Sequence, residues 1–251
     1  MVDFSKCMDH AIELILSARH MVALTGAGIS TEAGIPDFRG PHGMWQDSSL
    51  MEVLSAPSFR RDPATFYSAG LKLLGNIGHA QPTLAHQLLA KLEERGRLDA
   101  VITQNIDGLH RAAGSRTVYE LHGNYRTGHC TRCNTKYEME AFYEEIESGR
   151  LRVPLCSRCR GTIKPDIVLF QDLLPMDAWE DSRRAAGQCD LMLVLGSSLM
   201  VYPAAGLPQI TLDRGAALVI VNLEDTHYDE WANATVRAKL GDFACAALAR
   251  L

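Results

Sequence analysis

Met21-Val22-Ala23-Leu24-Thr25, followed by Gly26-Ala27-Gly28-Ile29-Ser30, is the stretch that indicates the fold of this chain. The apolar run is typical of a buried strand, and the glycines directly after it permit a tight turn into a helix. Such a turn lets the backbone approach a phosphate, whose charge is favoured by the N–H groups at the start of the next helix. The motif is short and lacks the third glycine of the usual dinucleotide fingerprint, so a tight turn without a ligand also explains it.

Further apolar strands alternate with helical stretches along the chain. Besides 21–25, strands are expected at 100–103, 117–121, 191–195 and 218–221. Helices are expected at 5–19, 83–95, 108–113, 176–186, 203–213 and 243–251. This alternation predicts an α/β fold with a doubly wound, mainly parallel, Rossmann-like sheet that is covered by helices on both faces.

Two stretches interrupt the alternation and predict a smaller inserted lobe. Residues 36–80 are rich in loop-forming residues and then helical, and residues 125–169 contain paired cysteines. The Rossmann-like domain is therefore expected to consist of residues 1–35, 81–124 and 170–251. The two insertions are expected to form a loop-plus-helical module and a metal-binding module over the sheet edge.

Composition limits the classes of protein to which the chain can belong. With 251 residues and 47% hydrophobic content, it can bury a sizeable core in one domain with an insertion. A net charge of −5 argues against general nucleic-acid binding. The sequence has no visible secretory signal, and no apolar run approaches the roughly 20 residues of a membrane span. We expect a cytoplasmic protein with neither nucleic acid nor membrane as partner; the oligomeric state stays open, with a monomer slightly favoured.

Four of the seven cysteines are spaced like metal ligands. Cys130-x2-Cys133 and Cys156-x2-Cys159 are separated by 22 residues, which fits a tetrahedral zinc site with four thiolates. Because cysteine fills every position, no coordination site is left for water, and the predicted role of the zinc is structural. A redox pair or a disulfide is the alternative, and His129 is a possible substitute ligand.

Polar side chains follow two of the predicted strands. Gln104, Asn105 and Asp107 come after the strand at 100–103, and His122 comes after the strand at 117–121. The carboxyl ends of parallel strands meet at one crevice, where these groups can recognise a carboxamide and supply a base. For Asp107 the alternative is capping of the helix at 108–113. His110, on that helix, is expected to support the polar surroundings of the site.

Taken in order, these segments resemble the sirtuin family of NAD-dependent protein-lysine deacylases. The resemblance also rests on three further segments: Gly34-Ile35-Pro36-Asp37-Phe38-Arg39-Gly40, Gly196-Ser197-Ser198-Leu199 and Val221-Asn222-Leu223-Glu224. It covers the chain from about Ser17 to about Phe243, and the short termini are similar to the minimal catalytic core of prokaryotic members.

The resemblance implies that NAD is a co-substrate bound by the Rossmann-like domain. The positions implied to bind it are Gly26, Ala27, Gly28, Ile29, Phe38, Arg39, Gln104, Asn105, Ile106, Asp107, Gly196, Ser197, Ser198, Asn222, Leu223, Glu224, Asp242 and Phe243. Among them, Asp107 is implied to hold the nicotinamide carboxamide, and Arg39 lies in a loop that closes over NAD.

The resemblance also implies the reaction. An acyl group would leave a protein lysine with consumption of NAD, giving nicotinamide, O-acyl-ADP-ribose and free lysine. His122 is implied to act as the base that removes a proton from a ribose hydroxyl. Mono-ADP-ribosyl transfer to a protein at the same site and NAD binding without turnover remain alternatives, and the presence of His122, Asn105 and Asp107 favours deacylation.

By the same resemblance, the segment Val168-Leu169-Phe170 pairs with the substrate peptide as an added strand. The carbonyl of Val168 is implied to accept a hydrogen bond from the acyl-lysine amide. The chain departs from the family directly afterwards, where Gln171-Asp172 replaces the usual Gly-Glu. Peptide preference and rate are therefore open.

A second departure concerns the acyl group. Relatives that remove succinyl or malonyl groups carry Tyr-x-x-Arg after a phenylalanine in the helical module. This chain has Phe66-Tyr67-Ser68-Ala69-Gly70, with Tyr67 at a substrate-binding position and Gly70 at the arginine position. Since no guanidinium is available there to pair with an acidic acyl group, a preference for neutral acyl groups is expected.

Overall fold

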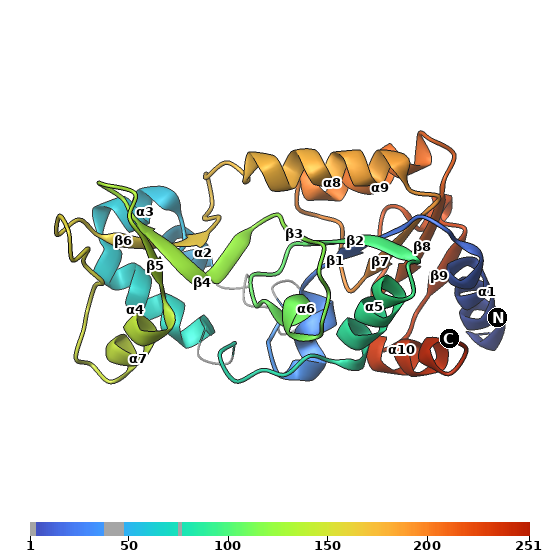
Figure 1. Ribbon diagram of the computed structural model, residues 1–251, viewed down its shortest axis with the longest axis horizontal. Coiled ribbons are helices and arrows are strands. Elements are labelled where there is room, and N and C mark those ends of the chain that lie inside the picture. Colours follow the sequence, from blue (N-terminus) through green and yellow to red (C-terminus); the bar gives the residue numbers. More distant parts are fainter. Residues whose placement is uncertain (1–3, 38–47, 75–76) are drawn as a thin grey trace.

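Six parallel strands form the main sheet, in the order β3-β2-β1-β7-β8-β9 (Figure 1). The computed structural model describes residues 4–37, 48–74 and 77–251. The strands are β1 (Met21–Thr25), β2 (Leu98–Thr103), β3 (Val118–Glu120), β7 (Leu191–Leu195), β8 (Ala217–Val221) and β9 (Ala234–Val236). From β1 the strand order runs one way to β2 and β3, and from β7 it runs the other way to β8 and β9. In doubly wound sheets, ligands bind at the carboxyl ends of the strands where the order reverses in this way.

Helices cover both faces of this sheet (Figure 1). One face carries α1 (Phe4–Ser17), α5 (Leu84–Glu94) and α10 (Leu240–Leu248), and the other carries α8 (Met176–Gln188) and α9 (Leu207–Leu212). The short elements η1 (Ala27–Ala33), α6 (Leu109–Ala112), η3 (Ala204–Gly206) and η4 (Asp229–Trp231) lie in the connections. The α/β class and the doubly wound sheet predicted from the sequence are confirmed.

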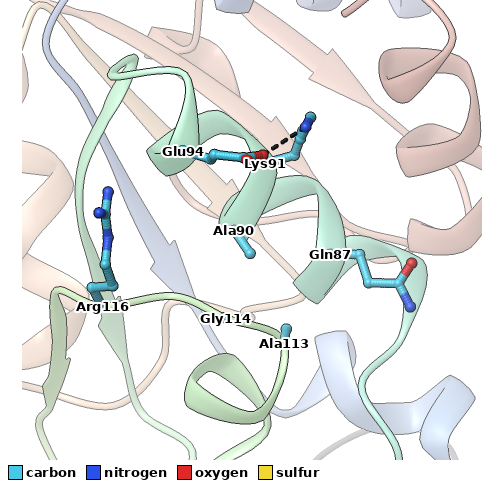
Figure 2. Close-up of a pocket in the computed structure, with 7 residues that line it drawn as sticks. All are labelled: Gln87, Ala90, Lys91, Glu94, Ala113, Gly114 and Arg116. Atoms are coloured by element: carbon cyan, nitrogen blue, oxygen red, sulfur yellow. Dashed lines mark hydrogen bonds and ion pairs between the residues drawn. The ribbon is translucent and has the colours of Figure 1, made fainter.

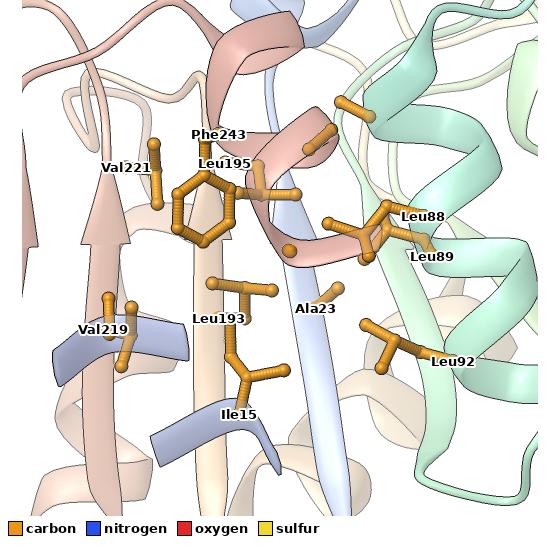
Figure 3. Packing of buried hydrophobic residues seen from close by; sticks show 14 of the residues in the cluster. Ile15, Ala23, Leu88, Leu89, Leu92, Leu193, Leu195, Val219, Val221 and Phe243 are labelled. Carbon is orange, nitrogen blue, oxygen red and sulfur yellow. The ribbon is translucent and has the colours of Figure 1, made fainter. Parts of the chain in front are cut away.

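Alternating side chains of the central strands fill two cores. Ala23, Leu193 and Val219 point toward α1, α5 and α10, where Phe243 and Leu89 pack against them (Figure 3). Their neighbours Val22 and Met192 belong to the core on the α8 and α9 side. Because β1 and β7 are buried on both faces, they are continuous apolar runs without polar alternation.

A smaller lobe contains a second sheet of three antiparallel strands, β4 (Gly123–Cys130), β5 (Lys136–Glu138) and β6 (Ile163–Ile167), in the order β5-β4-β6. Helices α2 (Ser48–Val53), α3 (Ala56–Arg61), α4 (Pro63–Leu74) and α7 (Glu140–Glu147) pack beside it. Phe59, Phe66 and Tyr67 share one hydrophobic core with Met139 and Ile163. The helical insertion and the cysteine-bearing insertion therefore pack together around one core.

No helix in the described part of the chain is both long and apolar enough to cross a membrane.

Candidate active site

The turns that follow β1 and β7 interlock through their glycines. The Gly28 N–H donates to the Gly196 carbonyl at 2.9 Å, and a Cβ on Gly28 would lie 2.7 Å from the Cα of Gly196. Gly196 has φ +61°, and its own Cβ would lie 2.6 Å from the Gly28 carbonyl carbon and the Ile29 nitrogen. Backbone thus packs directly on backbone here. The element after β1 is a 3-10 helix, and the N–H of its second residue, Gly28, donates to Gly196. This differs from the expected turn into a regular helix with free N–H groups.

Gln104, Asn105 and Asp107 come together with these turns. The Asn105 side-chain amide donates to the Gly26 carbonyl and to Ser30 Oγ, both at 3.1 Å. Ser30 Oγ in turn donates to Asp107 Oδ2 at 2.7 Å. Asn105 and Asp107 are each only 7% exposed, so at the carboxyl ends of β1 and β2 these side chains form a buried network of hydrogen bonds.

Asp107 has two roles in the structure. Its Oδ1 accepts from the Leu109 N–H at 2.9 Å, which makes the carboxylate the cap of α6, as the alternative interpretation of the sequence expected. Its Oδ2 accepts from Ser30 at the crevice. The two interpretations are therefore compatible.

His122 joins the site at the turn between β3 and β4. Its Nδ1 lies 2.8 Å from the carbonyl oxygen of Gln104. Because a carbonyl can only accept, Nδ1 carries the proton and Nε2 carries the lone pair. Burial lowers the pKa of His122, and the hydrogen bond to Gln104 opposes that shift only in part. The ring is therefore neutral at physiological pH and has an accepting nitrogen, as a general base requires.

The Gln104 side chain extends the site toward β7. Its Nε2 donates to Ser197 Oγ at 3.0 Å, and the same hydroxyl accepts from the Leu199 N–H at 3.3 Å. Ser198 beside it is half-buried. The segments after β1, β2, β3 and β7 thus meet at one place, as the strand ends of this fold allow.

The remaining predicted cofactor positions lie beside this crevice in the sheet. After β8, the side-chain N–H of Asn222 donates to the backbone carbonyl of Glu224 at 2.9 Å. Leu223, between these two residues, is 65% exposed. Asp242 is exposed on the first turn of α10, whereas the side chain of Phe243 is fully buried in the core. Only the backbone of Phe243 can therefore face a ligand.

The last four predicted cofactor positions lie near the start of the chain and after β2. Ala27 and Ile106 are half-buried, and Phe38 and Arg39 lie outside the described residues.

The four predicted metal ligands converge in the small lobe. The Sγ atoms of Cys130, Cys133, Cys156 and Cys159 all lie within 4.8 Å of one another, with Cys130 and Cys159 at 3.4 Å and Cys133 and Cys156 at 3.6 Å. Four thiolates about 2.3 Å from a tetrahedral zinc would be about 3.8 Å apart, so the cluster fits a structural zinc. His129 pairs with Asp166 at 2.6 Å and is not part of the cluster.

The predicted peptide-binding segment runs from β6 past His122. The Val168 N–H donates to the His122 carbonyl at 2.9 Å, and the Phe170 carbonyl accepts from the Ala56 N–H at 3.0 Å. Asp172 Oδ2 accepts from the Leu169 N–H at 3.2 Å and pairs with Lys164 at 3.1 Å. No described residue donates to the Val168 carbonyl. The segment is therefore fixed on one edge, and Phe170 is 39% exposed.

Tyr67 is not brought to the crevice with the other predicted site residues. It is 2% exposed in the core of the small lobe, and its hydroxyl donates to the Ile163 carbonyl at 2.7 Å. Gly70 lies one turn further along α4, and a Cβ there would meet no atom of the described residues within 4 Å.

Four residues that complete the site were absent from the predicted set: Thr25, Ser30, Glu32 and His86. Thr25 and Ser30 were visible only as parts of the strand-turn motif. Glu32 Oε1 accepts from the Gly241 N–H at 3.2 Å and so joins η1 to α10. His86 is the third residue of α5, where its ring caps the helix start, and the Thr83-x-x-His86 spacing could have indicated this.

A separate surface groove of about 380 Å³ lies between α5 and the loop before β3 (Figure 2). Its lining includes Gln87, Lys91, Glu94 and Arg116, and it contains none of the predicted site residues. The Lys91–Glu94 pair spans one turn of α5 at 2.6 Å. This groove is a surface feature of the helix and is not the candidate active site.

Similarity to known proteins agrees with this site. A model of the Sir2 family matches residues 26–203. An NAD-dependent protein deacetylase of Thermotoga maritima is 46% identical over 237 residues, covering 94% of this chain and 95% of the relative. One from Sulfolobus acidocaldarius is 44% identical, covering 92% of this chain and 90% of the relative.

Solved structures give the same result. A structure of Sir2 with a p53 peptide and NAD+ superposes with a TM-score of 0.88 at 44% identity, covering 97% of this chain and 98% of that chain. A structure of Sir2 bound to an acetylated peptide has a TM-score of 0.88 at 43% identity, with the same coverage. On its sequence, its fold and the residues at its crevice, this chain belongs to the Sir2 family.

Proposed function

We propose that the chain removes acetyl and other neutral acyl groups from lysine side chains of proteins, consuming NAD and yielding nicotinamide, O-acyl-ADP-ribose and free lysine. The observation that carries the proposal is His122, whose Nε2 is an unprotonated acceptor at the same crevice as Asn105 and Asp107. The relatives, named NAD-dependent protein deacetylases or deacylases, support the same activity.

The residues present fit NAD. The turns at Gly26 and Gly196 follow the carboxyl ends of β1 and β7, where doubly wound sheets bind nucleotides, and the buried Asp107 carboxylate can accept from a carboxamide N–H. Asn222 and Glu224 at the end of β8 are suited to ribose hydroxyls. When bound, NAD supplies an anomeric carbon that accepts the acyl oxygen as nicotinamide leaves.

His122 performs the proton transfer in this proposal. The Gln104 carbonyl holds Nδ1–H, so the lone pair of Nε2 is fixed in direction and can take a proton from a ribose hydroxyl. A neutral amide oxygen is a poor nucleophile, and the chain's main contribution is therefore to hold the reactants in line.

The substrate would enter as a strand along Val168–Phe170, with the Val168 carbonyl accepting from the acyl-lysine amide. The Val168 N–H is already held by the His122 carbonyl, which keeps the proposed peptide site in register with the base. Gly70 provides no cation for an acidic acyl group, and this supports neutral acyl groups.

The comparisons do not favour the mono-ADP-ribosyltransferase alternative. Because the acyl group would end on ADP-ribose and the amide bond would be cleaved with water, the activity combines transferase and hydrolase character. A cytoplasmic location, the absence of nucleic-acid and membrane partners and a monomeric state are parts of the same proposal that rest on the sequence alone.

The test is mass spectrometry of an acetyl-lysine peptide incubated with the protein, with and without NAD. NAD-dependent loss of acetyl with an equal amount of O-acetyl-ADP-ribose is the expected result. An ADP-ribose adduct on protein without peptide deacetylation would contradict the proposal. A succinyl-lysine peptide of the same sequence is the matched control and is expected to be cleaved at least about tenfold more slowly, since its carboxylate would lose water without gaining an ion pair.

A further inference from the structure

Two buried histidines lie beneath the crevice and take no part in the proposed chemistry. His86 is 0% exposed on the first turn of α5, and His110 is 2% exposed on α6. Their ring centroids are 4.6 Å apart with planes tilted by 56°. Histidine is seldom fully buried, and two rings in contact need a reason.

Each ring uses one nitrogen for a protein hydrogen bond. His86 Nδ1 lies 3.2 Å from the Thr83 backbone nitrogen and 2.8 Å from Thr83 Oγ1. His110 Nε2 lies 2.9 Å from Thr25 Oγ1. In the described part of the chain, neither His86 Nε2 nor His110 Nδ1 has a hydrogen-bond partner, although both atoms are buried.

Both rings are neutral at physiological pH. Burial lowers the pKa of His86 to about 4, against the opposing effect of the nearby Asp107 charge. Burial likewise lowers the pKa of His110 well below its usual value. A neutral imidazole has one N–H donor and one accepting nitrogen, and in the described part of the chain one nitrogen of each ring has no partner. Buried polar atoms of this kind are normally paired, often through an internal water.

We propose that His86 Nε2 and His110 Nδ1 bind one buried water between them, and that this water-bridged pair positions the cofactor-binding turn at Asp107. Because a water can both donate and accept, it satisfies both nitrogens. The other nitrogen of His110, Nε2, is hydrogen-bonded to Thr25 Oγ1. Hydrogen bonds then connect the start of α5 with the end of β1.

This chain of hydrogen bonds joins the parts that form the crevice. Thr83 Oγ1 donates to the Ile29 carbonyl at 3.1 Å and ties α5 to η1, beside Ser30. His110 follows Leu109, whose N–H donates to Asp107. The pair therefore sets the distance between Ser30 and Asp107, which are themselves hydrogen-bonded. The effect on cofactor binding rests on the proposed function, whereas the water site does not.

The direct test is a high-resolution crystal structure of the whole chain. A water peak within about 3.2 Å of both His86 Nε2 and His110 Nδ1 is expected. A direct ring-to-ring hydrogen bond, or a site without a peak, would overturn the proposal. This experiment needs no activity, so its outcome is independent of the proposed function.

The positioning role is tested by kinetics of three variants. His110→Phe keeps a ring but removes both nitrogens, and it is expected to raise the KM for NAD about tenfold with kcat within about threefold. His110→Gln retains a donor and an acceptor and is expected to recover most of that loss. His10→Phe, which changes an exposed histidine on α1, is the matched control and should behave as wild type.

Equal impairment by His110→Phe and His110→Gln, or an unchanged KM for NAD in His110→Phe, would contradict the positioning role. If wild-type protein itself shows no NAD-dependent turnover, the proposed function fails, and the water site is then judged by the crystal structure alone.

Discussion

His122 belongs to both halves of the proposed reaction. Its ring is oriented by the Gln104 carbonyl, and its own carbonyl accepts the N–H of Val168 in the peptide segment. A single residue therefore fixes the base relative to the cofactor crevice through its side chain and relative to the substrate strand through its backbone. Substitution of the side chain leaves the second contact intact, which is why a variant can be inactive and still folded.

The pH dependence of catalysis follows from this environment. Burial lowers the pKa of His122 below its usual 6.5, and the unprotonated ring is the active form. As pH falls from 8, kcat/KM is expected to stay level and to reach half its value at a pH below 6.5. His122→Phe should lose deacylation while zinc content and melting temperature persist. An acid midpoint above 7 would contradict this assignment.

Asp107→Asn separates cofactor binding from folding. The asparagine can still accept from Leu109 N–H, as the present carboxylate does, but it loses the negative charge that accepts from Ser30. We expect nicotinamide exchange to fall at least about tenfold, with a loss of unfolding free energy of about 1 kcal/mol or less. The measurements are base exchange with labelled nicotinamide and urea denaturation. Proportional losses in both would count against the role of Asp107.

At the scale of elements, the interlocked turns after β1 and β7 permit a sharp test of close packing. In Gly196→Ala the new Cβ meets backbone atoms of Gly28 and Ile29 at 2.6 Å, at φ +61°. Clash and strain together should cost roughly 2–4 kcal/mol, which lowers the melting temperature by roughly 5–15 °C in a chain of this size.

Gly215→Ala is the matched control for this substitution. Gly215 has φ +74°, but a Cβ there would meet nothing within 4 Å, so only the backbone strain applies. We expect a cost of about 1 kcal/mol. Equal costs at the two positions would show that the interlocking contact contributes nothing.

Gln171 is a second element-level test, because it has φ +73° at the position where the family usually has glycine. Gln171→Gly removes about 1 kcal/mol of left-handed strain from the folded state. It also gives the unfolded chain more conformational freedom, which costs a similar amount on folding, so the free energy of unfolding should change by less than about 0.5 kcal/mol. Gln171→Val should lose about 1–2 kcal/mol, because a branched side chain fits this conformation poorly. Thermal unfolding measures both, and a more stable valine variant would contradict the strain argument.

The elements also show what the sequence could predict. The strands at 21–25 and 191–195 were predicted with their observed bounds, because both are apolar runs bounded by turn residues. β9 was missed, since three residues carry no detectable period. Strands β4 and β5 were not predicted either, because half-exposed polar strands lack the apolar alternation on which such predictions depend.

The site divides in the same way. Asp107 and His122 could be located because polar side chains directly after buried strands must converge in a doubly wound sheet. The contacts of Asn105 with Gly26 and Ser30, and the buried pair of His86 and His110, depend on distances between segments about 24 to 79 residues apart. No local pattern encodes those distances. The same holds for Phe243, whose side chain packs in the core.

At the scale of the whole molecule, the cysteine cluster supports the active site from the far end of the small lobe. Cys130 ends β4, and β4 begins directly after His122, while β6 continues into the peptide segment. Loss of zinc should therefore disorder the sheet that connects these two points.

Cys156→Ser is the corresponding variant. It is expected to lose bound zinc, measured by plasma mass spectrometry, to melt at a lower temperature and to lose deacylation. Cys245→Ser changes an exposed cysteine outside the cluster and should retain one zinc per chain and full activity. A zinc-free Cys156→Ser protein with wild-type activity would refute the structural role of the metal.

The packing of Gly28 on Gly196 limits which residues related proteins can have at these two positions. Replacing either glycine alone would force the two strand ends apart, so we expect relatives to keep both glycines whether or not they still bind a nucleotide. A relative that retains both glycines thereby reveals the architecture of its sheet. Whether such a relative carries out the same chemistry is indicated by whether it also has Asp and His at the positions of Asp107 and His122.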